Sequence, residues 1–224
     1  MGLAVARAAL AKEAEVFIVG RSPERLALVA SELETKRMQT IAADVTREDD
    51  VRRIFKQVGH FDHLVVTAAA DLAYQPIREL DLDAARKSID SKLIAALLLA
   101  KYAAATIAEH GSITFTAGIA AERPMPSGAI VAMVNGALFS LAYALAVGLA
   151  PVRVNAISPG WVDTPLWETA FGANRSAMLQ QMAQRLPAGR IGLPEDIAHA
   201  VIFLMENEFT TGTVLRVDGG HRLV

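Results

Sequence analysis

Residues suited to ligand binding follow four apolar runs that have the length and composition of buried strands. A guanidinium pairs with phosphate, and a glycine lets the backbone approach a ligand closely. If these runs are parallel strands, their carboxyl ends meet at one edge of a sheet, which is where such sheets bind ligands. The residues at these ends are Arg21 and Ser22, Asp44, Thr67 with Ala68 and Ala69, and Pro159 with Gly160.

Other kinds of active site have little support in the composition. The chain contains no cysteine, which excludes disulfides, thiol catalysis and thiolate metal sites and fits a reducing, cytoplasmic compartment. It contains five histidines, and none has metal-ligand spacing with another or belongs to a nucleophile motif. We therefore expect no metal site. The histidines are His60, His63, His110, His199 and His221.

The overall composition predicts one globular domain. The 224 residues are 53% hydrophobic and 21% charged, which suits a single domain spanning 1–224 with a sizeable core. The formal net charge is −2, so there is no basic surplus to neutralise a nucleic-acid backbone, and we expect no nucleic-acid partner.

The elements that position these residues alternate between strand and helix. Strands are predicted at 15–19, 38–42, 63–67, 112–116, 152–157 and 213–217. Helices are predicted near the start, after the caps Ser22 and Thr46, over 83–109, after Pro124, over 176–186 and from Pro194. Strands separated by helices predict an α/β fold, a doubly wound parallel sheet covered on both faces.

Several short motifs, in this order, give the chain a resemblance to the short-chain dehydrogenase/reductase (SDR) superfamily over essentially its whole length. They are Gly20-Arg21-Ser22, Ala43-Asp44-Val45, the run Arg153–Gly160 (RVNAISPG), Thr164-Pro165-Leu166 and Val217-Asp218-Gly219-Gly220. Each motif is weak alone, but the ordered set is specific. The resemblance implies a Rossmann-like sheet of the SDR type and a nicotinamide dinucleotide cofactor.

The resemblance also assigns residues to parts of that cofactor. Arg21 would pair with a ribose 2′-phosphate and Ser22 would add a hydrogen bond, which favours NADP over NAD. Asp44 would contact the adenine, Thr67, Ala68 and Ala69 the adenosine, and Pro159, Gly160 and Thr164 the nicotinamide. The alternatives are an exposed surface arginine, a local turn or cap at Asp44, and an ordinary loop after the strand that ends near Ile157.

The amino-terminal motif of the family is largely absent. SDR proteins begin with a strand and a T-G-x-x-x-G-x-G turn at the pyrophosphate, and only Gly2 resembles its final glycine. Without that strand, the strands at 16–19 and 64–67 would each keep an unpaired edge. We therefore expect that a segment precedes Met1 in the native protein, so that the domain 1–224 is incomplete at its amino terminus. An intact mass of 23.9 kDa for the protein expressed from its native gene would reject this expectation.

The family's catalytic positions also differ. Its serine, tyrosine and lysine correspond to Ala117, Val131 and Asn135, and its relay asparagine aligns with Ser91, which is followed by Lys92. Valine cannot transfer a proton. The first hypothesis is an NADP-dependent oxidoreductase whose mechanism is non-standard or lost. The alternative is a catalytically silent sensor or partner subunit that binds a nucleotide or metabolite.

Three polar residues remain candidates for chemistry near the expected cleft. They are Lys92, Thr116 and Asn135, and each has a simpler interpretation as a solvated lysine, a strand-end threonine or a locally bonded asparagine. The two tryptophans Trp161 and Trp167 flank Thr164, and we expect them to line a pocket rather than only to anchor the loop.

Two apolar helices indicate whether the chain contacts a membrane or another protein chain. Residues 124–152 carry no charge, yet they are rich in alanine and contain proline and asparagine, so we expect a helix buried in protein and no membrane partner. The resemblance implies a homodimer or homotetramer through this helix and the long one before it. The apolar residues assigned to that interface are Ile94, Leu97, Leu98, Leu138, Leu141 and Leu145.

Overall fold

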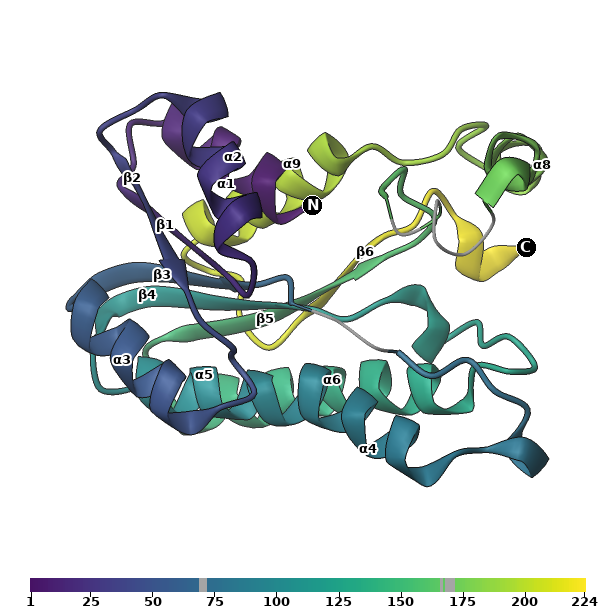
Figure 1. The fold of residues 1–224 in the computed structure, drawn as a ribbon, viewed down its shortest axis with the longest axis horizontal. Coiled ribbons are helices and arrows are strands. Elements are labelled where there is room, and N and C mark those ends of the chain that lie inside the picture. The colour runs from purple at the N-terminus through teal and green to yellow at the C-terminus, as the bar shows by residue number, and fades with distance from the viewer. Residues whose placement is uncertain (69–71, 166, 168–171) are drawn as a thin grey trace.

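Parallel strands form the centre of the fold in the computed structural model, which describes residues 1–68, 72–165, 167 and 172–224 (Figure 1). Strand β1 pairs with β2, and a second sheet has the order β3-β4-β5-β6. Every pairing is parallel, which confirms the predicted doubly wound α/β class. The strands are β1 (Val16–Gly20), β2 (Met38–Ala42), β3 (Phe61–Val66), β4 (Ile107–Thr116), β5 (Arg153–Pro159) and β6 (Val214–Val217).

The sheet is divided between β1 and β3, and the expectation that a segment precedes Met1 stays a prediction. Within the described ranges no strand joins β1 to β3, so six strands form sheets of two and four. The prediction that β1 is a buried strand was wrong, because Val16, Phe17 and Ile18 are only half-buried and Val19 is 36% exposed. A strand that has a neighbour on one edge alone keeps part of its surface in solvent.

Helices cover both faces of the sheets (Figure 1). One layer holds α1 (Gly2–Ala11), α2 (Pro23–Leu33) and α9 (Pro194–Glu206), and the other holds α3 (Glu48–Val58), α4 (Leu82–Ile89), α5 (Ala95–Ala103) and α6 (Ala129–Gly148). Successive strand residues face opposite layers. Ile113 and Phe115 therefore pack with α5 and α6, whereas Ile157 packs with α1 and α9. The remaining helix, α8 (Arg175–Arg185), follows the loop after β5.

Of the two predicted helix caps, one is confirmed. The Ser22 hydroxyl accepts a hydrogen bond from the Arg25 amide at 3.2 Å, and Pro23 takes the first helical position of α2. Thr46 does not cap α3, which begins after Arg47. The Thr46 hydroxyl instead donates to the Asp44 carboxylate at 2.8 Å, so it stabilises the turn that precedes the helix.

The single long helix predicted over 83–109 was wrong. The structure has α4, then a π-helical segment at Asp90–Ile94, then α5, which ends at Ala103. Residues 107–109 belong to β4, where Ile107 pairs with Phe61 of β3. The apolar side chain of Ile107 fits a helical period, but pairing with a neighbouring strand decides its conformation.

The uncharged helix α6 is long and apolar enough, by length and composition alone, to cross a membrane. In this fold it packs along β4 and β5, with Leu138 and Ala142 in the core. Leu138 is 2% exposed, so its assignment to a surface between subunits was wrong. The exposed large apolar residues described in this layer are Leu82, Ile94, Leu97, Met133, Tyr143 and Val147.

Candidate active site

The predicted ligand residues gather at the carboxyl ends of the parallel strands. Arg21 follows β1, Asp44 follows β2, Thr67 follows β3 and Gly160 follows β5. The Ala43 amide donates to the Gly20 carbonyl at 2.9 Å, which holds the ends of β1 and β2 together. This edge is where ligands bind in open parallel sheets.

Gly2 brings the start of α1 to this edge. A Cβ atom on Gly2 would lie 2.6 Å from the Thr67 hydroxyl oxygen, so a larger residue there would require the Thr67 side chain to move. Met1 at the N-cap makes no side-chain hydrogen bond to the helix. The first amides of an α-helix have no partner within the helix and suit an anion such as phosphate.

At the end of β1, Arg21 and Ser22 differ in exposure and in hydrogen bonding. Arg21 is exposed, whereas Ser22 is half-buried. The Ser22 hydroxyl accepts from the Arg25 amide and donates to the Glu24 carboxylate at 2.7 Å. This hydroxyl is thus already used for capping, and it could donate to a phosphate only by giving up Glu24. Arg21 is the side chain of this pair whose charge suits an anion.

Asp44 stabilises a local turn, as one of its two interpretations predicted. One oxygen of its carboxylate accepts from the Thr46 amide at 3.0 Å and from the Thr46 hydroxyl. The Asp44 amide in turn donates to the Asp50 carboxylate at 2.9 Å. These bonds fix the loop after β2, while contact between Asp44 and an adenine stays a prediction.

The loop after β5 is held by the neighbouring strand. The Gly160 amide donates to the Val217 carbonyl at 3.0 Å, and a Cβ atom on Gly160 would lie 2.7 Å from the Asp218 Cα. The glycine is therefore required by packing against the end of β6. Pro159 is buried at the end of β5, and Thr164 is half-buried. On the β3 side Ala68 is exposed, and Ala69 lies outside the described residues.

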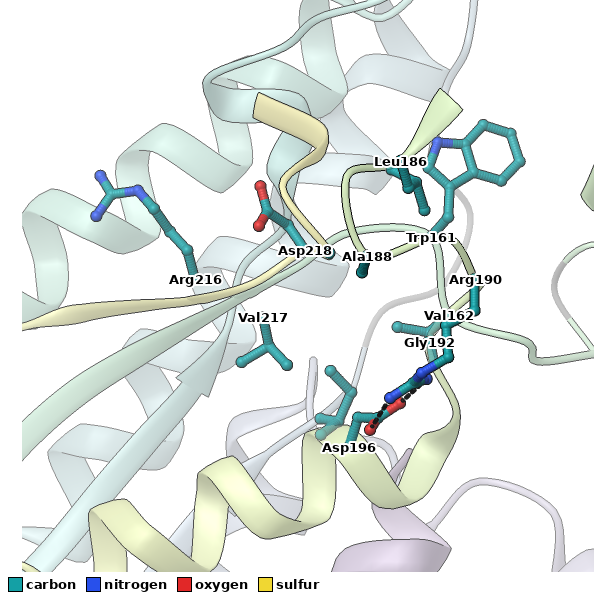
Figure 2. Close-up of a pocket in the computed structure, with 12 residues that line it drawn as sticks. Trp161, Val162, Leu186, Ala188, Arg190, Gly192, Asp196, Arg216, Val217 and Asp218 are labelled. Atoms are coloured by element: carbon teal, nitrogen blue, oxygen red, sulfur yellow. Dashed lines mark hydrogen bonds and ion pairs between the residues drawn. The ribbon is translucent and has the colours of Figure 1, made fainter. Parts of the chain in front are cut away.

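The two tryptophans stack on one another, with ring centroids 4.3 Å apart. Trp161 lines a cavity of about 210 Å³ between the loop after β5, the start of α9 and the end of β6 (Figure 2). Trp167 donates its indole N–H to the Val162 carbonyl at 2.7 Å, which anchors the loop. Figure 2 shows the Arg190–Asp196 ion pair on one side of the cavity. Its described lining includes none of the predicted cofactor residues.

The three residues predicted to occupy the family's catalytic positions are all buried. Val131 and Asn135 are each 2% exposed, and they lie on the face of α6 that also buries Val134 and Leu138, as their spacing predicted. Ala117 follows β4 and is 5% exposed. None of these three side chains ionises, and α6 contains no Asp, Glu, Lys, Arg or His.

Lys92, rather than Ser91, reaches this site from the π-helical segment. The Ser91 hydroxyl donates to the Ser88 carbonyl of the preceding turn at 3.3 Å. The Lys92 ammonium donates to the Ala117 carbonyl at 3.2 Å. Lys92 is 6% exposed, and this burial lowers the pKa of Lys92 to about 8. The signal in the sequence is a lysine followed directly by the apolar run Leu93–Leu99.

Buried polar atoms without partners lie at the ends of β4 and β5 and on α6. A Cβ atom on Gly118 would lie 3.4 Å from the Asn135 amide group, so Asn135 contacts the residue after Ala117. Among the described residues the Asn135 Oδ1 and the hydroxyl oxygens of Ser158 and Thr116 find no hydrogen-bond partner. Ser158 was missed by the sequence analysis, although it belongs to the RVNAISPG motif. Such groups are rare in protein interiors and often mark a functional site.

Comparison with known proteins identifies similar chains. A family model described as enoyl-(acyl carrier protein) reductase matches residues 1–222. A short-chain dehydrogenase/reductase of Stachybotrys chlorohalonatus, ATR9, is 32% identical over 98% of this chain and 92% of its own. The crystal structure of a small-chain dehydrogenase in complex with NADPH is 33% identical, with a TM-score of 0.82 over 94% of this chain and all of that one. The MalC reductase/Diels-Alderase of Malbranchea aurantiaca has a TM-score of 0.93 at 27% identity, over 100% of this chain and 92% of that one.

Proposed function

Because the chain belongs to the short-chain dehydrogenase/reductase superfamily, we propose that it is an oxidoreductase that binds a nicotinamide dinucleotide, with NADP preferred. The observation that carries the proposal is the placement of Arg21 beyond β1, at the strand-end edge that also holds Asp44, Thr67 and Gly160. The small-chain dehydrogenase of similar fold was crystallised with NADPH, which agrees with this choice of cofactor.

The residues at this edge fit such a cofactor. The start of α1 presents unpartnered amides to a pyrophosphate, and Gly2 keeps them close to the end of β3. Arg21 supplies the charge for a 2′-phosphate, and the loop at 159–164 borders the nicotinamide. When bound, a reduced nicotinamide supplies a hydride to an electrophilic carbon.

The mechanism that we propose differs from that of the family in the group that supplies the proton. A carbonyl that accepts a hydride must also gain a proton, and Val131 and Asn135 offer no acid with a suitable pKa. The same absence favours a second function, a catalytically silent subunit that senses a nucleotide or metabolite. Turnover separates the two functions, because only the oxidoreductase consumes its nucleotide when a carbonyl compound is reduced.

Titration of the protein with NADPH and with NADH, followed by nucleotide fluorescence, tests the proposal. We expect saturable binding of NADPH and weaker binding of NADH. Failure of both nucleotides to bind would reject the proposed function. Equal affinity for the two would reject the preference for NADP.

Two further parts of the proposal concern assembly and location. Exposed apolar side chains on the outer layer, among them Leu97 and Val147, favour a homodimer or homotetramer. We place the protein in the cytoplasm, without a membrane or nucleic-acid partner, in keeping with its composition. Its substrate or ligand is a small molecule.

A further inference from the structure

The geometry around Ala117 points to Lys92 as the proton donor to the substrate oxygen. We propose that its ammonium takes the role of the missing phenol in the reduction of a carbonyl compound. The inference rests on the proposed function, since it requires a hydride donor at the same edge. It assigns a role to a residue outside the family's serine, tyrosine and lysine positions.

The first support is the way in which the chain directs Lys92 inward. The π-helical segment Asp90–Ile94 interrupts the layer between α4 and α5, and both Ser91 and Lys92 are buried within it. Single turns of π-helix are costly and often occur at functional sites. The segment therefore buries a lysine at a position in the helical layer where an apolar side chain would also fit.

The second support is the surroundings of the ammonium. Its described hydrogen bond to the Ala117 carbonyl uses one of three N–H donors. The segment packs against α4, α5 and α6, and the ammonium contacts the end of β4. Among the described residues no ion pair includes Lys92, and burial lowers its pKa. A lysine held in this way is near the balance between its charged and neutral forms at physiological pH.

The third support is the pair of orphaned oxygens beside it. Ser158 shares the strand face of Val154 and Ala156, which pack with α6, and Asn135 contacts Gly118 from α6 itself. The Asn135 Oδ1 and the Ser158 Oγ have no partner in the described chain. Asn135 thus borders the residue after Ala117, and Ser158 follows Ile157, whose carbonyl accepts from the Ala117 amide at 2.9 Å. Both orphaned oxygens therefore lie around the residue whose carbonyl accepts from Lys92, where a polar atom of a ligand would find partners.

The proposed step balances as follows. Hydride addition to the carbonyl carbon moves the π electron pair of the C=O bond onto oxygen. One N–H bond of the Lys92 ammonium then breaks, and an O–H bond forms, which gives an alcohol and a neutral amine. A proton from the bulk solution then converts the amine back to the ammonium, so each turnover consumes one solvent proton. The reverse reaction would require the neutral amine as a base.

The first experiment compares the wild type with Lys92→Met and Lys92→Arg. NADPH oxidation is followed with benzaldehyde, 2,3-butanedione and ethyl acetoacetate, and NADPH affinity is measured in parallel. We expect Lys92→Met to lose at least about 100-fold in kcat, the usual size of an acid–base contribution, with NADPH affinity within about twofold of the wild type. Lys87→Met, an exposed lysine of α4, is the matched control and should retain full activity.

The variants separate proton donation from a role of charge alone. Arginine keeps the positive charge but does not release a proton near neutrality, so Lys92→Arg should be as inactive as Lys92→Met. For the wild type, kcat should fall as the pH rises above about 8, because the ammonium form is the acid. Activity restored by Lys92→Arg, or a pH profile unchanged by either variant, would overturn the assignment.

A readout independent of activity tests the burial of the charge. Methionine removes the charge and keeps the volume, so the Lys92→Met variant should still fold. At pH 7 it should unfold at a higher denaturant concentration than the wild type. This difference in stability should shrink as the pH rises from 8 towards 10.

Failure of NADPH to bind the wild type would reject the proposed function itself. NADPH binding without turnover of any of the three carbonyl probes would instead overturn the proton-donor role and favour the silent subunit.

Discussion

We propose that the preference for NADP depends on one side chain at the strand-end edge, Arg21. Arg21 is exposed there and carries a permanent charge, so Arg21→Ala should remove a charge-assisted bond to the 2′-phosphate. We expect NADPH affinity to fall roughly 10- to 100-fold while NADH affinity changes little. Fluorescence titration measures both. Arg25→Ala, an exposed arginine within α2, serves as the control, and an equal loss for both nucleotides would contradict the role of Arg21.

The buried Lys92 also makes a prediction about stability and pH. Its pKa is lowered on folding, so the unfolded chain binds the proton more tightly than the folded one. Relative to Lys92→Met, the free energy of unfolding should therefore rise as the pH increases from about 8 to about 10.5, by on the order of 3 kcal/mol. Urea denaturation over this pH range checks the sign. A difference between the two proteins that stays constant with pH would contradict a buried ammonium.

At the scale of elements, the junction between β5 and β6 depends on Gly160. A Cβ atom there meets the backbone of Asp218, which cannot move without disturbing β6, so Gly160→Ala should cost about 2 kcal/mol of unfolding free energy. Gly136→Ala is the matched control. It lies within α6, where a Cβ atom meets nothing within 4 Å, so it should stabilise the protein by about 1 kcal/mol. Equal effects in thermal unfolding would contradict this packing.

The start of α9 depends on Asp196. Its carboxylate accepts from the Leu193 amide at 2.7 Å and pairs with both terminal nitrogens of Arg190, and the pKa of Asp196 falls to about 2. A carboxyl with a lowered pKa contributes stability above its ordinary value near 4, and that contribution is lost as the pH falls towards 2. Because the pair is partly exposed, Asp196→Asn should cost about 1 kcal/mol at pH 7, and little at pH 2.

Chemical denaturation at both pH values measures this loss, with Glu195→Gln as the control. Glu195 is exposed in the same helical turn and makes no such bonds among the described residues. A loss at pH 2 equal to that at pH 7 would show that the carboxylate charge is not responsible.

The elements themselves were largely predictable, whereas their interruptions were not. Apolar runs such as Val152–Ile157 are short and bounded by turn residues. The strands that they form, and the order of these strands along the chain, therefore follow from local pattern. The end of α5 and the start of β4 at Ile107 depend on pairing with Phe61, which is distant in sequence. The π-helical segment likewise depends on packing, which is why Lys92 was recognised as a polar candidate but its bond to Ala117 was not foreseen.

At the scale of the whole molecule, the apolar surface of α5 and α6 predicts self-association. Leu97 is 42% exposed and Val147 is 82% exposed, both on the outer layer. The double variant Leu97→Glu with Val147→Glu should convert an oligomer to a monomer in sedimentation analysis, since charges at an interface core oppose association. Leu28→Glu, on the exposed face of α2, should leave the mass unchanged. An oligomer that persists in the double variant would place the interface elsewhere.

The division of the sheet between β1 and β3 also belongs to this scale, and the amino-terminal segment expected to fill it stays a prediction. The residues at the strand-end edge were predicted because parallel strands bring their carboxyl ends together. The prediction that Trp161 lines a pocket is confirmed, but the other walls of the cavity could not be predicted, because they come from residues as distant as Arg190 and Asp218. Its shape depends on how α9 and β6 meet the loop after β5, which no local pattern records.

A crystal structure of the protein grown with NADPH would test the central claim most directly. The account predicts a nucleotide along the strand-end edge, with its 2′-phosphate at Arg21, its pyrophosphate at the start of α1 and its nicotinamide beside Gly160 and Thr164. A nucleotide bound instead in the cavity lined by Trp161, or with its ribose phosphate remote from Arg21, would contradict the account.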